Sequence, residues 1–255
     1  MYKILVVSLP GSPKREALSA RLLEQGLAWE WVDGVRLEAV EEAAPEEYSD
    51  LEAYRIPRLK TDPDYIRRAV GCKRAMRNAL AWAACCEEEW VVILQDDARV
   101  MPEFDVKLRD ILSKAPATAG AVMLHYEGSA VLDCGEWKEV TGDLRSMAAF
   151  AVRPAYAEAM EDFLSSWGGE DDRIWAPLVR RGDLILAAKP MLVRTNHKGS
   201  DITSGIPELT GYWNSGTDRV LEIGFSGRSF CVEETFQCFL SFFMSLVRRF
   251  LKPFP

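Results

Sequence analysis

The segment VVILQDDA, residues 91–98, joins an apolar run directly to two adjacent carboxylic acids. Val91 to Leu94 have the continuous apolar, β-branched character of a strand that is buried on both faces. Asp96 and Asp97 follow at the point where such a strand leaves the core. In open α/β sheets, ligands bind beyond the carboxyl ends of the strands. The segment therefore predicts an α/β protein with a polar site at the end of this strand.

The segments on either side alternate between strand and helix patterns. Residues 4–9 are a continuous apolar run, residues 17–25 carry leucines at helical spacing, and residues 29–32 are a second short strand. Further helices are expected at residues 69–86, 104–112, 154–164 and 174–181, further strands at 121–126, 184–187 and 191–194, and a hairpin at 133–140. This order predicts an open, mostly parallel twisted sheet flanked by helices.

The chain of 255 residues is long enough for one large α/β domain, which we expect to span residues 1–228. Residues 38–65 are acidic with scattered prolines, which predicts a partly mobile surface insertion whose acids form a solvated face. Residues 229–255 form a tail with an amphipathic helix. Two roles stay open for this helix: docking on the core or on a second subunit, and peripheral membrane attachment through apolar side chains and a basic rim.

The composition, 48 % hydrophobic and 27 % charged, is typical of a soluble globular protein. The formal net charge of -8 argues against a general polyanion binder. A local basic strip on the helix expected near residues 69–86 remains a candidate nucleic-acid contact. The basic residues of this strip span more than one helix face, so a solvated helix surface is favoured over a nucleic-acid contact. The basic residues concerned are Arg67, Arg68, Lys73, Arg74 and Arg77.

The cysteine pattern argues for a reducing compartment. None of the six cysteines forms a C-x-x-C pair, so a zinc site is disfavoured and free thiols are expected. The apolar N-terminal run lacks the features of a secretory signal, and no stretch approaches the roughly 20 apolar residues of a membrane span. We therefore expect a cytoplasmic protein, with peripheral membrane contact as the alternative.

The adjacent acids need a physical explanation. Two neighbouring carboxylates repel each other and lose hydration if they are enclosed. A divalent cation relieves both problems, and oxygen ligands suit Mg²⁺ or Mn²⁺, which commonly share their coordination with substrate phosphates. One hypothesis is therefore that Asp96 and Asp97 hold a metal that holds a diphosphate. The other is that they form the N-cap and first turn of a following helix.

Several short motifs occur in the order found in a known family. They are ILVVSLP at residues 4–10 with Lys14 and Arg15 after it, VDGVRL at 32–37, GC at 71–72, VILQDDA at 92–98 and SDI at 200–202. In this order the chain resembles glycosyltransferase family 25, which includes lipopolysaccharide-modifying sugar transferases and collagen galactosyltransferases. Gln95 replaces the first acid of the family's E-D-D, and Ala75 and Met76 stand where the family has Ser-His.

The resemblance implies a GT-A fold and a metal-dependent hexosyltransferase. Such an enzyme moves a sugar from a nucleotide-sugar donor, a UDP-sugar, to an acceptor hydroxyl with inversion, using Mn²⁺ or Mg²⁺. The implied acceptor is a surface glycan of lipopolysaccharide biosynthesis. Two alternatives stay open: a transferase acting on hydroxymethylated bases of viral DNA, and a non-catalytic nucleotide-sugar or glycan-binding protein, which the changes at Gln95, Ala75 and Met76 favour. A phosphotransferase is disfavoured because no Gly-rich phosphate cradle appears.

The resemblance also implies roles for individual residues. The implied metal ligands are Asp97, Asp96 and His197. His197 is included because a late histidine often completes the metal coordination in GT-A enzymes. His125 lines the sugar pocket or is a packed histidine. The donor-binding residues are Leu9, Pro10, Lys14, Arg15, Gly71, Gln95, Asp96 and Lys198.

A second acidic cluster, GGEDD at residues 168–172, lies in a glycine-rich turn. Inverting sugar transfer needs a carboxylate that takes the proton of the acceptor hydroxyl. The cluster looks like the base-bearing turn of inverting GT-A enzymes. Asp171 is the first choice for the base, Asp172 is the next, and Glu170 is expected to hold the acceptor. The alternative is a capped helix start with exposed acids.

Overall fold

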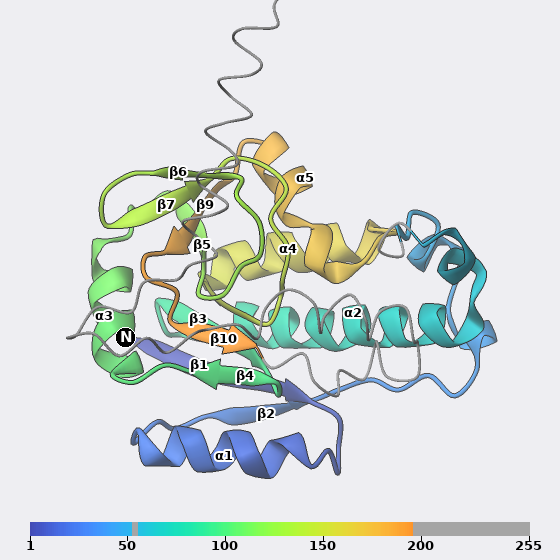
Figure 1. The fold of residues 1–255 in the computed structure, drawn as a ribbon, viewed down its shortest axis with the longest axis horizontal. Helices are drawn as coiled ribbons and strands as arrows, with labels where there is room; N and C mark the ends of the chain where they lie inside the picture. The colour runs from blue at the N-terminus through green and yellow to red at the C-terminus, as the bar shows by residue number, and fades with distance from the viewer. Residues whose placement is uncertain (53–55, 196–255) are drawn as a thin grey trace, which may run out of the picture. The chain divides into compact units, whose positions relative to one another are not determined.

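The computed structural model of the chain describes residues 1–52 and 56–195 (Figure 1). Three expectations lie outside these residues: His197 and Lys198, the SDI motif at 200–202, and the tail at 229–255. The described residues belong to one compact unit.

The centre of the described part is an eight-stranded sheet in the order β2-β1-β3-β8-β5-β9-β7-β6. The pairings β2-β1, β1-β3 and β5-β9 are parallel, and the others are antiparallel. It follows that β8 and β7 run opposite to the other six strands, so the predicted open, mostly parallel α/β sheet is confirmed. The strands are β1 (Tyr2–Ser8), β2 (Glu30–Asp33), β3 (Trp90–Gln95), β5 (Ala119–Met123), β6 (Val131–Asp133), β7 (Trp137–Val140), β8 (Ala149–Val152) and β9 (Leu184–Ala188).

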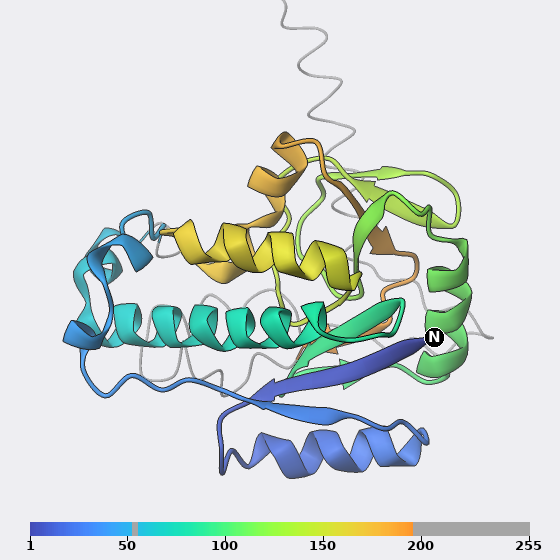
Figure 2. The ribbon, with the colours of Figure 1, turned by 180° about the vertical axis from the view of Figure 1, so that it is seen from behind.

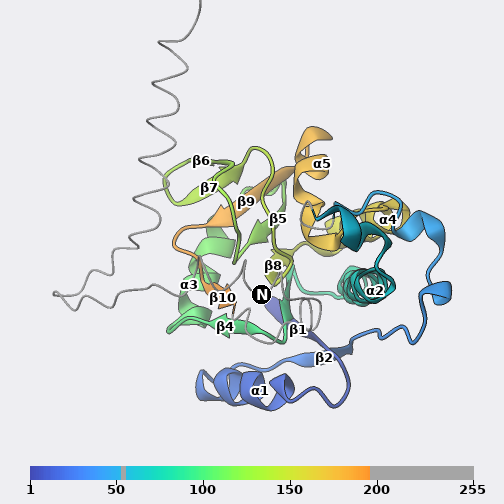
Figure 3. The same ribbon diagram turned by 45° about the vertical axis from the view of Figure 1, so that its right-hand side comes forward.

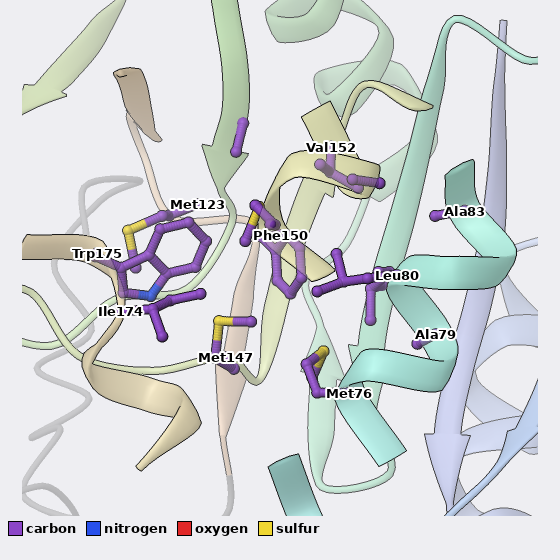
Figure 4. Packing of buried hydrophobic residues seen from close by; sticks show 14 of the residues in the cluster. Met76, Ala79, Leu80, Ala83, Met123, Met147, Phe150, Val152, Ile174 and Trp175 are labelled. Atoms are coloured by element: carbon purple, nitrogen blue, oxygen red, sulfur yellow. The ribbon is translucent and has the colours of Figure 1, made fainter. Parts of the chain in front are cut away.

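Helices cover both faces of this sheet (Figures 2 and 3). They are α1 (Lys14–Glu24), α2 (Pro63–Ala84), α3 (Phe104–Lys114), α4 (Pro154–Ser166) and α5 (Trp175–Arg180). Alternate residues of a strand point to opposite faces, so each strand supplies two apolar clusters. Leu5 and Ile93 pack with α2, α4 and α5, whereas Val6 and Val92 pack with α1 and α3. Figure 4 shows part of the first cluster, with Leu80 of α2 beside Phe150 of β8.

Helix α2 begins at Pro63, earlier than the predicted residue 69. The Asp62 side chain caps it by accepting a hydrogen bond from the backbone N–H of Tyr65, and Pro63 occupies the first turn, where its missing N–H costs nothing. Both residues are helix-start signals in the sequence. The longer helix places Tyr65 on α2 rather than in the insertion.

Strand β8 has no counterpart among the elements that the sequence predicts. It inserts antiparallel between β3 and β5. A second, two-stranded sheet pairs β4 (Ala98–Val100) with β10 (Val193–Thr195). Because β4 follows the acid pair directly, the hypothesis of a helix N-cap at Asp96 and Asp97 is wrong: the two acids form the turn between two strands.

The insertion at residues 38–65 is built from short 3-10 helices, η1 (Val40–Glu42), η2 (Pro45–Glu47) and η4 (Pro57–Thr61). Leu51 and Leu59 are buried in it. The expectation of a purely solvated acidic face is wrong for Glu47, whose carboxylate lies 2.6 Å from the Arg74 guanidinium on α2. Residues 38–52 are called the acidic strap below.

Candidate functional site

The carboxyl ends of three neighbouring parallel strands form the centre of the site. In register, Ser8 at the end of β1 pairs with Asp33 at the end of β2, and Val7 pairs with Gln95 at the end of β3. The parallel arrangement therefore brings the ends of VVS, VD and VILQ to one edge of the sheet. This is the location that the sequence predicts for a ligand.

Asp96 is held in place by the loop that follows β1. Its Oδ2 atom accepts hydrogen bonds from the hydroxyls of Ser8, at 2.7 Å, and Ser12, at 3.1 Å. The Lys14 ammonium lies 3.8 Å from its Oδ1 atom. Sequence reasoning missed the two serines, although a hydroxyl residue at the end of a strand and another in a P-G-S turn are visible signals. The contacts fix the carboxylate and leave its charge only partly compensated.

Arg15 joins the ends of β1 and β2. Its guanidinium donates to the carbonyl of Ser8, at 2.7 Å, and to the Asp33 carboxylate, at 2.6 Å, and it stacks over the Trp31 ring. The loop between β1 and α1 contains Leu9 and Pro10, which the sequence analysis predicts to bind the donor. A hydrogen bond from the Ser12 N–H to the Leu9 carbonyl closes this loop. Lys14 and Arg15 thus lie at the edge where the sequence placed them.

Two glycines permit close backbone packing at this edge. A Cβ atom on Gly71 would lie 2.6 Å from the Val35 carbonyl oxygen, and one on Gly34 would lie 2.9 Å from the Leu9 backbone nitrogen. Neither distance is compatible with a side chain. Gly71, predicted as a donor contact, therefore serves to bring α2 against the VDGVRL segment, which places the next residue of α2, Cys72, beside the end of β3.

Cys72 bridges the two acidic clusters. Its Sγ atom accepts a hydrogen bond from Gln95 Nε2, at 3.8 Å, and donates to Asp171 Oδ2, at 3.4 Å. Burial and the charges of Asp171, Asp172 and Asp97 raise the pKa of the thiol well above its ordinary value, so it stays protonated and can donate. An acid in place of Gln95 would add one more negative charge to this group. The neutral amide, which departs from the family pattern, is a hydrogen-bond donor here.

The second departure from the family pattern, Ala75 and Met76 in place of Ser-His, affects packing in the core. Ala75 and Met76 lie on the core face of α2 and are buried, and Met76 packs in the cluster that contains Leu80 and Phe150 (Figure 4). These two positions therefore contribute apolar packing, and the polar Ser-His pair of the family has no equivalent at them.

The acidic turn contains three carboxylates in different environments. Glu170 accepts hydrogen bonds from the Tyr65 hydroxyl, at 2.9 Å, and from the Glu52 backbone N–H, at 3.1 Å, so it ties the acidic strap to the turn. Asp171, 5 % exposed, begins the 3-10 helix η5 (Asp171–Arg173). Asp172 is partly exposed, but its buried Oδ1 atom has no hydrogen-bond partner within the part of the chain that the structure describes.

The two aspartates of the turn differ in their tendency to hold a proton. Burial, together with the charges of Asp171 and Glu170, raises the pKa of Asp172 to about 8, against the opposing effect of Arg173 and Arg145. Burial also raises the pKa of Asp171, but the Cys72 thiol, two backbone N–H groups and the Lys73 charge oppose this rise. In such a coupled pair one proton is shared. The contacts that favour ionised Asp171 place the negative charge preferentially on Asp171 and the proton on Asp172.

The raised pKa of Asp172 predicts a pH-dependent stability. Between about pH 4, near the ordinary pKa of an unfolded aspartate, and about pH 8, the folded chain holds a proton that the unfolded chain has released. The free energy of unfolding therefore falls as the pH rises through this window. Asp172→Asn removes the effect and is expected to stabilise the protein at pH 9 by at least about 1 kcal/mol, or a few degrees in Tm, with a smaller gain at pH 5. Thermal melts of both proteins across this range check it, and a Tm difference that does not change with pH would contradict it.

A strained turn borders the acidic cluster. Ser146 has a φ of 98°, which is unfavourable for a residue with a side chain. Its carbonyl accepts a hydrogen bond from Trp175 Nε1, at 2.8 Å, and its hydroxyl accepts one from the Ala148 N–H, at 3.1 Å. The Gln95 N–H in turn donates to the Ala148 carbonyl, at 2.8 Å. These bonds tie α5 to the end of β3.

His125 is a packed histidine, the second of its two predicted roles. It is buried, and its Nδ1 lies 3.2 Å from the Val193 carbonyl, so Nδ1 carries the proton and donates. Its Nε2 lies 3.3 Å from the Thr195 hydroxyl. His125 therefore fixes β10, whose Thr195 pairs with Ala98, the residue after Asp97.

The acid pair has the donor chemistry of a Mg²⁺ or Mn²⁺ site. In residues 1–52 and 56–195, no three His, Cys, Asp or Glu side chains gather as a complete metal site. Asp96 and Asp97 offer carboxylate oxygens, and ions of this type commonly take one or two carboxylates and complete their coordination with substrate phosphates. The residues present therefore fit a metal that arrives with a diphosphate.

Four of the five basic residues of α2 are buried or make contacts within the protein. Arg67 donates to the carbonyls of Leu37 and Glu38, Arg74 pairs with Glu47, and Arg77 pairs with Glu161. Lys73 is buried. These contacts bind the acidic strap and α4, so the strip has little charge left for an external polyanion.

Comparisons with known proteins give limited information. No protein-family model matches the chain, and no curated protein sequence matches it. Among solved structures, mannose-1-phosphate geranyltransferase from Thermus thermophilus aligns with a TM-score of 0.36 and 14 % identity over 73 % of each chain. A mutant Drosophila beta-1,4-galactosyltransferase 7, in complex with manganese, UDP-Gal and xylobiose, aligns with a TM-score of 0.36 and 11 % identity over 82 % of this chain and 79 % of that one. Similarity at this level assigns no function.

Two further findings concern membrane-spanning helices and the state of the cysteines. No helix in the described ranges is long and apolar enough to cross a membrane. The cysteines described, Cys72, Cys85, Cys86 and Cys134, are free thiols.

Proposed function

We propose that the protein is a metal-dependent glycosyltransferase of the GT-A type, which moves a sugar from a nucleotide-sugar donor to an acceptor hydroxyl. One observation carries the proposal. The acid pair at the end of β3 lies within two hydrogen bonds, Gln95 to Cys72 and Cys72 to Asp171, of a buried acidic turn. A site for a diphosphate-bound metal and a group able to take a proton are therefore neighbours, as sugar transfer requires.

The donor side of the site consists of the ends of β1 and β3 with the loop between β1 and α1. Asp97 and Asp96 would hold the metal, which supplies positive charge to the donor diphosphate. Lys14 and Arg15 stand at the same edge and would stabilise the negative charge of the departing nucleoside diphosphate. Lys198 and His197, which lie outside the described residues, are proposed for the donor and the metal on the ground of the family resemblance alone.

The acidic turn would supply the general base. As the acceptor oxygen forms its bond to the anomeric carbon, the bond to the leaving diphosphate oxygen breaks and the hydroxyl proton passes to the carboxylate of Asp171. Asp171 suits this role because the Cys72 thiol, two backbone N–H groups and the Lys73 charge favour its ionised form over that of Asp172. Direct attack by the acceptor gives inversion at the anomeric carbon. Glu170 has both carboxylate oxygens engaged by the chain, so its contribution is to shape the turn.

The proposed acceptor is a surface glycan or lipopolysaccharide, and the proposed donor is a UDP-sugar, both on the ground of the family resemblance. The internal pairing of the α2 arginines favours a glycan over viral DNA. A non-catalytic binding protein would not need an ionised carboxylate beside the donor site. Free thiols accord with a cytoplasmic location, which we propose with it.

A thermal-shift screen of nucleotide sugars, with and without Mn²⁺, tests the proposal. A ligand that binds only the folded state at 100 times its Kd stabilises it by about 2.7 kcal/mol, which corresponds to several degrees. We expect one nucleotide sugar to raise Tm in the presence of Mn²⁺, and Mn²⁺-dependent release of nucleoside diphosphate from that donor. No shift with any donor would overturn the proposal, and binding without release would favour the non-catalytic alternative.

A further inference from the structure

Lys73 is a buried cation that the chemistry above does not use. It is 2 % exposed and lies on α2, next to Cys72. Burying an ammonium group is costly unless hydrogen bonds and charges compensate for the lost water. The contacts of Lys73 therefore indicate why the chain places it there.

Three backbone carbonyls surround the ammonium group. Lys73 Nζ donates to the carbonyl of Glu47 in the acidic strap, to that of Trp167 at 2.6 Å, and to that of Gly169 at 3.5 Å. An ammonium group has three N–H donors, and all three are matched here by carbonyl acceptors. A neutral amine would leave one carbonyl without a donor, so the geometry calls for the charged form.

These carbonyls belong to the segments that must stay together at the site. Gly169 lies in the acidic turn, Trp167 directly precedes that turn, and Glu47 belongs to the strap that packs on it. The packing is tight: a Cβ atom on Gly168 would lie 2.2 Å from the Ser49 hydroxyl oxygen, and the Asp50 N–H donates to the Gly168 carbonyl at 3.1 Å. The neighbouring residue Cys72 binds Asp171 at the other end of the turn. Two successive residues of α2 thus hold both ends of it.

We propose that Lys73 is a positioning residue of the catalytic site: its buried ammonium group locks the acidic strap and the start of the acidic turn onto α2, and so holds Asp171 beside Cys72 and the end of β3. The expected effect of Lys73 on turnover rests on the proposed function. Its role in holding the acidic strap and the acidic turn on α2 does not depend on that function.

Lys73 also acts through its charge. Its charge lowers the pKa of Asp171. Burial, helped by the nearby charge of Arg77, lowers the pKa of Lys73 itself, and the charges of Glu47, Asp171 and Glu170 oppose this. The other groups that act on Asp171 are the Cys72 thiol, which lowers its pKa, and the coupled carboxyl of Asp172. Removing the ammonium charge should therefore raise the pKa of Asp171 and leave less of the ionised base near neutral pH.

Three variants of the full chain separate these effects. Lys73→Met removes the donors and the charge, Lys73→Arg keeps the charge but cannot place three N–H groups on the same carbonyls, and Arg74→Gln is the matched control. Arg74 is the next residue on α2, and among the described residues its side chain donates to the Glu47 carboxylate and the Glu42 carbonyl, both in the acidic strap. Amide hydrogen exchange reports positioning, and the pH profile of Mn²⁺-dependent nucleoside diphosphate release reports the base.

Lys73→Met is expected to speed exchange in residues 167–173 and 45–50, whereas Arg74→Gln should speed it only in 42–50. Turnover should fall about 10- to 100-fold in Lys73→Met, with the donor KM within about twofold, because a misplaced catalytic group costs rate rather than donor binding. The acidic limb of the pH profile should move to higher pH in Lys73→Met and stay in place in Lys73→Arg.

Wild-type exchange in residues 167–173 together with an unmoved acidic limb in Lys73→Met would overturn the proposal. If Lys73→Met does not fold, Lys73→Arg decides it: faster exchange in 167–173 with lower turnover supports the positioning role, and wild-type values of both overturn it. If the wild-type protein releases no nucleoside diphosphate with any donor, the proposed function fails, and the exchange measurements still decide whether Lys73 holds the turn.

Discussion

Asp171→Asn is expected to lower turnover about 10³-fold while the affinity for the donor stays nearly unchanged. Asparagine keeps the shape of the side chain, and its carbonyl oxygen still accepts the hydrogen bond that Cys72 donates to Asp171 in the wild type. It cannot take a proton from an acceptor hydroxyl. The donor-binding residues at the end of β3 are untouched, so the loss should appear in kcat rather than in the donor Kd.

Asp172→Asn is the matched control for this experiment. Because the pKa of Asp172 is raised to about 8, this residue holds a proton near neutral pH, and the neutral amide imitates that state. Turnover of Asp172→Asn at pH 7 should therefore stay within about tenfold of the wild type. The reverse pattern, with Asp171→Asn active and Asp172→Asn inactive, would move the base to Asp172. Wild-type turnover in both variants would remove the turn from the catalytic site.

Asp97→Ala is expected to abolish Mn²⁺-dependent donor binding, with a loss of affinity of at least about 100-fold. Asp97 sits in the turn between β3 and β4, partly exposed, and its charge raises the pKa of the Cys72 thiol. With Asp97 gone, Asp96 alone would have to hold the metal, and Asp96 is already engaged by Ser8 and Ser12. Isothermal calorimetry of Mn²⁺ and of the donor, alone and together, measures the effect.

Asp110→Ala provides the comparison for Asp97→Ala. Asp110 is an acid on α3 whose carboxylate pairs with Lys114 on the same helix, so its removal changes net charge by the same amount away from the acid pair. It should bind Mn²⁺ and donor as the wild type does. An unchanged Mn²⁺ affinity in Asp97→Ala would exclude Asp97 as a ligand and with it the metal-dependent form of the proposal.

The local elements follow from local signals in the chain. The apolar run at residues 91–94, the Asp62-Pro63 start of α2 and the glycine after α1, Gly26 with a φ of 68°, each encode an element through side-chain pattern or backbone preference within a few residues. The sequence analysis nevertheless did not predict β8, because four successive apolar residues, Ala149–Val152, carry no periodic pattern that separates a strand from a loop.

The sequence by itself determined that an acid pair ends a buried strand and that a second acidic cluster lies in a glycine-rich turn, since both facts concern neighbouring residues. Only the tertiary structure decided that the clusters are neighbours, because Cys72 and Asp171, which join them, are 99 residues apart. It also decided that Asp172 holds its proton and that Lys73 is enclosed by carbonyls. Burial sets the cost of a charge, and which groups are buried together depends on how the whole chain packs.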